Sequence, residues 1–214
     1  METNVQKAAI AEFFGTFVLV FIGAAAVVAA AGSGGVVTAA LGHGFILVGL
    51  IYAFATFSGG HFNPAVTLAI LIAGKMDAAR AVIYWVAQFA GAIIAGFLCN
   101  AILTSSGPTT GTLTTDAVWT AALLEGVVTF IFVSVIFQAA VFGKGGTLAP
   151  IAIGLTLAAC IFAAGPFTGA SLNPARTLGP ALASGDLSYV IPYFVGIFGG
   201  GALAALVQTY LMGE

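Results

Sequence analysis

The sequence carries one short motif twice, as SGGHFNPAVTL at residues 58–68 and as TGASLNPARTL at residues 168–178. Six of the eleven positions are identical, and each copy is centred on Asn-Pro-Ala. Asn is a favoured N-cap residue, and Pro suits the first helical position because its missing N–H has no partner there in any helix. The motif therefore predicts one helix that begins at Asn63 and another that begins at Asn173.

The two predicted helices are too short to cross a bilayer. The apolar stretches Asn63–Ile72 and Asn173–Ala183 would each be about 15 Å long, half of a hydrocarbon core. The residues just before them contain Gly and are predicted to be non-helical, and such backbone is tolerated at membrane depth only inside protein or along a water-filled cavity. We therefore expect two re-entrant half-helices whose positive N-terminal ends meet near the midplane.

The composition of the chain is that of a membrane protein. Apolar residues make up 61% of it and charged residues 6%, against about 25% charged residues in soluble proteins. Residues 13–74 contain no Lys, Arg, Asp or Glu. Such a chain cannot form a hydrated surface, which excludes a soluble or disordered protein, and with a net charge of −2 and no basic patch we expect no nucleic-acid partner.

Six segments are apolar enough and about long enough to span the bilayer. They are Ala8–Ala31, Ala39–Phe57, Ala79–Leu103, Ala117–Phe142, Leu148–Ala164 and Leu187–Tyr210. We therefore predict an all-α membrane protein with six transmembrane helices and two re-entrant half-helices.

The motif repeat extends upstream, where Glu12 precedes its Asn-Pro by 51 residues and Glu125 precedes its own by 48. Each half then has three spans and one half-helix, and because three is odd, the second half enters the membrane from the opposite side. We expect one transmembrane domain over residues 1–214, built as an inverted 3+3 repeat of about residues 8–103 and 117–212. In such repeats, paired interrupted segments indicate the transport site.

Basic residues predict the orientation. With six spans, Lys7, Lys75, Arg80 and Lys144 all fall on the side of the N-terminus. The positive-inside rule then places both termini in the cytoplasm. Arg176 is different, because it lies inside the second half-helix, and an ionisable group at that depth is a functional candidate.

Other chemistry is sparse. Cys99 and Cys160 belong to no Cys/His cluster, and no nucleophile or cofactor motif occurs, so we expect no metal, no cofactor and no enzymatic activity. Glu12 and Glu125 lie within spans, where a carboxylate must be paired, hydrogen-bonded or neutral. A proton relay is one reading of them, and a structural role is the other.

These motifs, together with AEFFGT at residues 11–16, resemble the aquaporin or major intrinsic protein family over nearly the whole chain. The resemblance implies a homotetramer in the lipid bilayer with a narrow pore in each subunit. It also implies passive conduction of water or small neutral solutes, without protons or ions. The pore motifs would be Asn63, Pro64 and Ala65 with Asn173, Pro174 and Ala175, the two Asn side chains donating to permeating molecules.

The resemblance further implies an outer constriction formed by His43, Ile161, Ala170 and Arg176. His43 and Arg176 would be its two polar donors. Histidine with isoleucine at these positions is similar to the tonoplast intrinsic proteins, some of which also pass ammonia, urea or hydrogen peroxide. The corresponding location is the plasma membrane or a vacuole-type internal membrane.

The family also implies structural roles for three further residues. Glu12 and Glu125 would each accept backbone N–H groups from a pore loop. His61 would line the pore toward the cytoplasm, or merely cap the loop.

Two alternatives remain. One is a glycerol-type facilitator. Members of that group carry Asp, and Lys or Arg, at the positions where this chain has Thr177 and Ala181, although Pro192 is similar to the residue found in facilitators. An ion-coupled secondary transporter also uses inverted repeats and broken helices, but it needs a carboxylate at the substrate site. Glu12 and Glu125 instead lie far upstream of the motifs.

Overall fold

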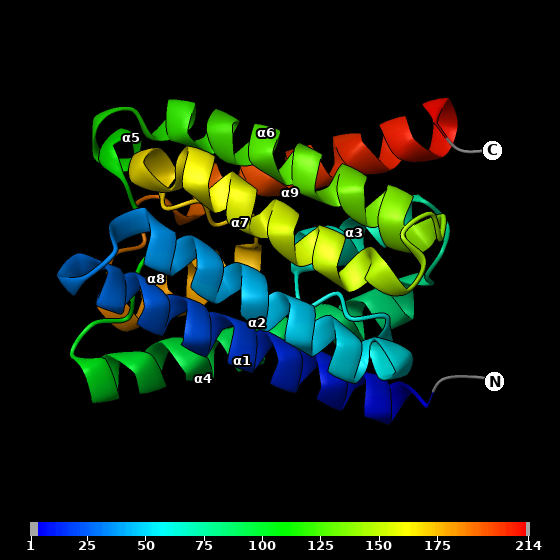
Figure 1. Ribbon diagram of the computed structural model, residues 1–214, viewed down its shortest axis with the longest axis horizontal. Coiled ribbons are helices and arrows are strands. Elements are labelled where there is room, and N and C mark those ends of the chain that lie inside the picture. Colours follow the sequence, from blue (N-terminus) through cyan, green and yellow to red (C-terminus); the bar gives the residue numbers. More distant parts are fainter. Residues whose placement is uncertain (1–3, 213–214) are drawn as a thin grey trace.

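The structure, a computed structural model described over residues 4–212, confirms the six predicted spans (Figure 1). Each of them is long and apolar enough to cross a membrane, and the described residues form no strand. The spans are α1 (Val5–Gly32), α2 (Gly35–Ser58), α4 (Ala78–Leu103), α6 (Val118–Ile136) continued by a π-turn (Phe137–Val141), α7 (Ala149–Thr168) preceded by a 3₁₀ turn (Gly146–Leu148), and α9 (Val190–Leu206) continued by a π-turn (Val207–Leu211).

The start of the second span differs from the prediction because of the backbone conformation of a glycine. We expected the second span to begin at Ala39, but α2 begins at Gly35. Gly34 has φ 77°, a left-handed conformation that suits glycine, and it reverses the chain within two residues. The helix therefore starts earlier than the apolar pattern indicates.

The two half-helices are also present, as α3 (Pro64–Ile72) and α8 (Pro174–Ser184). The Asn63 side chain caps α3 by accepting from the Ala65 N–H at 2.9 Å. Asn173 caps α8 by accepting from the Ala175 N–H at 3.0 Å. The Asn-Pro-Ala motif thus begins each half-helix through the N-cap geometry that its residue types favour.

The connection between α4 and α6 contains a short helix that the sequence did not predict, α5 (Thr112–Asp116). Its first turn is stabilised by the Gly111 N–H, which donates to the Thr114 hydroxyl at 2.9 Å. Earlier in the same connection the buried Ser106 hydroxyl donates to the carbonyl of Pro180 in α8 at 2.9 Å. This connection therefore folds against the second half-helix instead of extending as an open turn.

The two halves of the chain interlock. α1 packs on α2 and α4, as α6 packs on α7 and α9, and each half-helix packs chiefly against the last span of the other half: α3 on α9, and α8 on α4. The N- and C-terminal ends of the described chain lie at the same end of the bundle (Figure 1). We call it the terminal end of the molecule.

Glycines allow the closest helix contacts. A Cβ at Gly200 in α9 would overlap the carbonyl oxygen of Gly126 in α6, and a Cβ at Gly179 in α8 would overlap the Ala92 carbonyl in α4. Between apolar helices in lipid, such close backbone approach supplies the van der Waals packing that holds them together.

We predict that Gly200→Val lowers the free energy of unfolding in detergent by about 1–3 kcal/mol, the usual cost of overpacking a tight contact. Thermal or denaturant unfolding of the purified protein measures it. Gly199→Val is the matched control, because a Cβ at the neighbouring position meets no atom within 4 Å. Equal stability of the two variants would contradict the role assigned to this contact.

Candidate functional site

The two half-helices meet through a reciprocal pair of hydrogen bonds. The Asn63 amide Nδ2 donates to the carbonyl of Leu172 at 2.8 Å, and Asn173 Nδ2 donates to the carbonyl of Phe62 at 2.9 Å. Each amide nitrogen carries two hydrogens, so each keeps a second N–H for another acceptor. The N-terminal ends of α3 and α8, and their positive dipole ends, are thereby held close together.

The loop before each Asn has an unusual backbone. Phe62 has φ 49° and Leu172 has φ 53°, in the left-handed region that non-glycine residues rarely occupy. Such a conformation persists only where the surroundings hold it in place. Two buried carboxylates do so here.

Glu12 in α1 holds the first loop. Its Oε1 accepts from the Ser58 hydroxyl at 2.6 Å and from the His61 N–H at 2.9 Å, and its Oε2 accepts from the Phe62 N–H at 2.7 Å. The side chain is fully buried. The carboxylate therefore replaces the hydrogen-bond partners that a helix would have given this backbone.

Glu125 in α6 holds the second loop in the same way. It accepts from the Thr168 hydroxyl at 2.6 Å and from the N–H groups of Ser171 and Leu172 at 2.9 Å each. It too is fully buried. The matching pattern in both halves is what the repeat requires of the two glutamates.

Three further side chains support the loops, and the sequence analysis missed them. Gln88 Nε2 donates to Glu12 Oε2 at 2.8 Å and to the Thr67 hydroxyl at 2.9 Å. Tyr84 donates to the Ser58 carbonyl at 2.8 Å, and Tyr193 donates to the Thr168 carbonyl at 2.8 Å. The available signal was a polar side chain inside an apolar span, which by itself identifies no partner.

His61 is held beside the first half-helix. Its Nδ1 lies 3.0 Å from the Thr67 hydroxyl, and the same hydroxyl lies 3.2 Å from the carbonyl of Asn63. This contact fixes the ring next to the start of α3.

His43 and Arg176 are in direct contact. The Arg176 Nε–H donates to His43 Nε2 at 2.8 Å, and both side chains are buried, with 4% and 1% exposure for Arg176 and His43. A guanidinium cannot accept, so Nδ1 carries the imidazole hydrogen and donates to the Ala39 carbonyl at 2.8 Å. Both ring nitrogens are thus used within the protein, and the expectation that His43 donates to solute is wrong for this arrangement.

Arg176 has further donors besides its Nε–H. Its buried Nη1 has no hydrogen-bond partner among residues 4–212. Ile161 (2% exposed) and Ala170 (fully buried) belong to the main apolar cluster. Ala170 has φ 45°, where the first repeat has Gly60.

Cavities run through this region. A cavity of about 430 Å³ at the terminal end includes His61, Leu47 and Gly143 in its lining, and one of about 390 Å³ at the opposite end includes Ile161 and Val27. Between them lies a cavity of about 20 Å³, lined by Leu19, His43, Leu47, His61, Asn63, Phe132, Leu157, Ser171, Leu172, Asn173 and Arg176.

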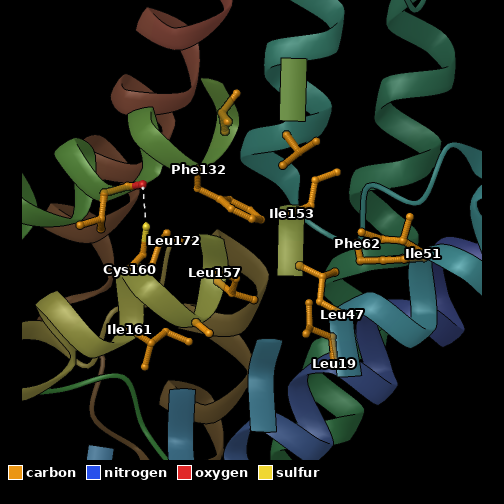
Figure 2. Close-up of a cluster of buried hydrophobic side chains, with 14 of the residues drawn as sticks. Leu19, Leu47, Ile51, Phe62, Phe132, Ile153, Leu157, Cys160, Ile161 and Leu172 are labelled. Carbon is orange, nitrogen blue, oxygen red and sulfur yellow. Dashed lines mark hydrogen bonds between the residues drawn. The ribbon is translucent and has the colours of Figure 1, made fainter. Parts of the chain in front are cut away.

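The lining of the narrow cavity is part apolar and part polar. Leu19 and Leu47, from α1 and α2, face Phe132 and Leu157, from α6 and α7, across the space in Figure 2. The polar lining comes from the two loops, their Asn caps and the Arg176–His43 pair. Apolar side chains therefore lie on opposite sides of the cavity, and the loops and the Arg176–His43 pair add polar groups to it.

We predict that Glu12→Gln and Glu125→Gln each lower both stability and water permeability. A neutral amide accepts at one oxygen only and presents its own N–H groups to donors, and a buried donor left unpaired costs about 1–3 kcal/mol. Unfolding in detergent and light scattering from proteoliposomes measure the two effects. Asp116→Asn, at an exposed carboxylate, is the control, and normal behaviour of both Glu variants would refute the assigned role.

Comparisons with known proteins agree with this architecture. The sequence profile described as Major intrinsic protein matches residues 1–208. The chain is 40% identical over 216 residues to a probable aquaporin TIP2-2 of Oryza sativa subsp. japonica, covering 96% of this chain and 87% of that protein. It is 41% identical over 218 residues to aquaporin TIP1-1 of Zea mays, covering 96% and 86%.

The fold has a solved counterpart. The crystal structure of the aquaglyceroporin from Plasmodium falciparum superposes with a TM-score of 0.82, at 23% identity, over 98% of this chain and 97% of that one. At that identity the likeness concerns the fold alone. The profile match, the TIP-type relatives and the paired Asn-Pro-Ala half-helices together show that the chain belongs to the major intrinsic protein family.

Proposed function

We propose that the protein is a passive channel that conducts water across a membrane and excludes protons and ions. The observation that carries this proposal is the pair of crossed Asn caps, which aim two helix N-termini at one narrow cavity. The relatives named as aquaporins support it.

The size and lining of the narrow cavity suit single molecules of water. About 20 Å³ leaves room for one water, which needs at least about 10–15 Å³. The second N–H of Asn63 and of Asn173, together with the Arg176 guanidinium and the His61 ring, would replace the partners that water loses on entering. The apolar part of the lining offers no competing partner, so neutral water crosses at little cost.

Cations meet a different situation. Each half-helix end carries about half a positive charge, and Arg176 adds a full one nearby. Aquaporin-type selectivity generally combines pore width, lining donors and positive half-helix ends. In a buried cavity these charges repel a cation far more strongly than they would in water.

Small neutral solutes belong to the proposal, and glycerol does not. Ammonia is close to water in size, and urea has flat N–H and C=O groups that could meet Arg176. Thr177 stands where glycerol facilitators, by the family resemblance, carry Asp. Its hydroxyl donates to the Asn173 carbonyl at 3.1 Å and lies 2.6 Å from the Ser171 hydroxyl. Thr177 is not among the residues that line the narrow cavity.

The coupled-transporter alternative lacks a free carboxylate at the site. Glu12 and Glu125 are occupied by loop donors and do not line the narrow cavity. A proton relay would need one of them to exchange protons with that cavity. We therefore propose a channel without proton coupling.

We also propose the assembly and location. Four copies would form a homotetramer with one pore in each subunit, as the family resemblance implies. The terminal end would face the cytoplasm, since Lys7, Lys75 and Lys144 belong to the segments at that end, and the TIP-type relatives favour a vacuole-type membrane.

The decisive experiment measures water and current in the same proteoliposomes. We expect stopped-flow light scattering to show rapid osmotic water flux without any ion gradient, and voltage clamp to show no proton or sodium current. Asn63→Asp is a useful variant, because it removes the amide N–H groups while keeping the N-cap oxygen. Currents comparable to the water flux in the wild type would refute the proposal.

We predict that Ile161→His preserves water flux and lowers the flux of ammonia or urea. Histidine at this position adds a polar side chain to the lining of the outer cavity. By the family resemblance, strict water channels carry histidine there and pass few other solutes. Light scattering with each solute measures the ratio, and Ile151→His, at a half-exposed position on the same helix, controls for the added imidazole. Unchanged ratios would place selectivity elsewhere.

A further inference from the structure

One face of α1 points toward the cavities. Gly15, Leu19, Gly23 and Val27 follow one another at intervals of four residues and so share a face of the helix. Leu19 lines the narrow cavity, and Val27 lines the outer one. The two glycines on this face, Gly15 and Gly23, leave space that other parts of the chain fill.

Gly23 provides the space for the imidazole of His43. A Cβ at Gly23 would lie within 3 Å of three ring atoms, Nε2, Cδ2 and Cε1. Gly15 does the same for the ring of Phe62, two helical turns away. Glycine is a poor helix former beside alanine, so its presence in mid-helix calls for a packing reason, and at Gly23 that reason is the imidazole.

A displacement of the His43 imidazole would disturb its hydrogen bonds. It is bound at both ends, to the Ala39 carbonyl at 2.8 Å and to Arg176 Nε at 2.8 Å. With a methyl group on α1 behind it, the ring has to move away from α1, toward the narrow cavity that His43 itself lines. That movement breaks at least one of the two hydrogen bonds and changes the direction of the guanidinium.

We propose that Gly23 is a specificity-determining position. Because it has no side chain, the His43 ring can lie against α1, and this sets the direction of the Arg176 guanidinium and the width of the narrow cavity beside it. Gly23 touches no permeating molecule and acts through His43, so it is a positioning residue. This inference rests on the proposed channel function.

The test is a double-mutant cycle in proteoliposomes. The set comprises the wild type, Gly23→Ala, His43→Ala, the double variant and Gly32→Ala, with the permeabilities to water, ammonia and urea measured for each. We expect Gly23→Ala to change the urea-to-water ratio by about tenfold, the factor that corresponds to one lost hydrogen bond of about 1.4 kcal/mol. In the His43→Ala background the same substitution should have no effect, because the ring it displaces is gone.

Gly32 lies on the same helix as Gly23, and a Cβ there would meet no atom within 4 Å. Gly32→Ala should therefore match the wild type. The inference is overturned if Gly23→Ala behaves as wild type, if Gly32→Ala has the same effect, or if Gly23→Ala acts equally in both backgrounds. Should Gly23→Ala fail to fold, recovery of folding in the double variant supports the inference, and failure of the double variant overturns it.

The cycle also separates this inference from the function on which it rests. A wild type that passes only water refutes the proposed solute range, and the coupling of Gly23 to His43 is then measured on water flux. A wild type that passes nothing refutes the channel, and the coupling is then measured on thermal unfolding, where Gly23→Ala should destabilise only the protein that has His43.

Discussion

Non-helical backbone in the middle of a membrane has to find every hydrogen-bond partner within the protein, and the rest of this structure depends on that constraint. The loops before Asn63 and Asn173 are such backbone. Glu12 and Glu125 meet the requirement with acceptors from neighbouring spans. A buried carboxylate is costly, but here three or more donors surround each one, so loop and carboxylate stabilise each other.

The two halves of the chain share the same hydrogen bonds at the Asn caps but differ in charge beside them. Thr67 and Thr177 each bond to the carbonyl of their own Asn cap, in matching places. Beside the cap, however, the first repeat has Val66 and the second has Arg176. The full charge is therefore on one side of the Asn pair only, toward the cavity opposite the terminal end. Such asymmetry lets one half set the width and charge of a constriction while the other shapes the inner opening.

Most of the fold could be predicted because lipid restricts the choices. The six spans follow from apolar length, and the half-helices follow from the N-cap and first-turn preferences of Asn and Pro. The short helix α5 was missed, since a polar five-residue segment has no periodic signal. Gln88 was missed for another reason: a polar side chain in a span shows that a partner exists but leaves its identity open.

The sequence by itself determined the membrane environment, the inverted repeat, the half-helices and the candidate pore motifs, because each depends on local composition or on motif spacing. Only the tertiary structure decided what those residues do to one another. His43 and Arg176 are 133 residues apart, and their contact makes the histidine an acceptor instead of a donor to solute. The space for that ring comes from Gly23 on a third segment. Hydrogen-bond direction and free volume arise only where segments distant in the chain pack together, so no local pattern encodes them.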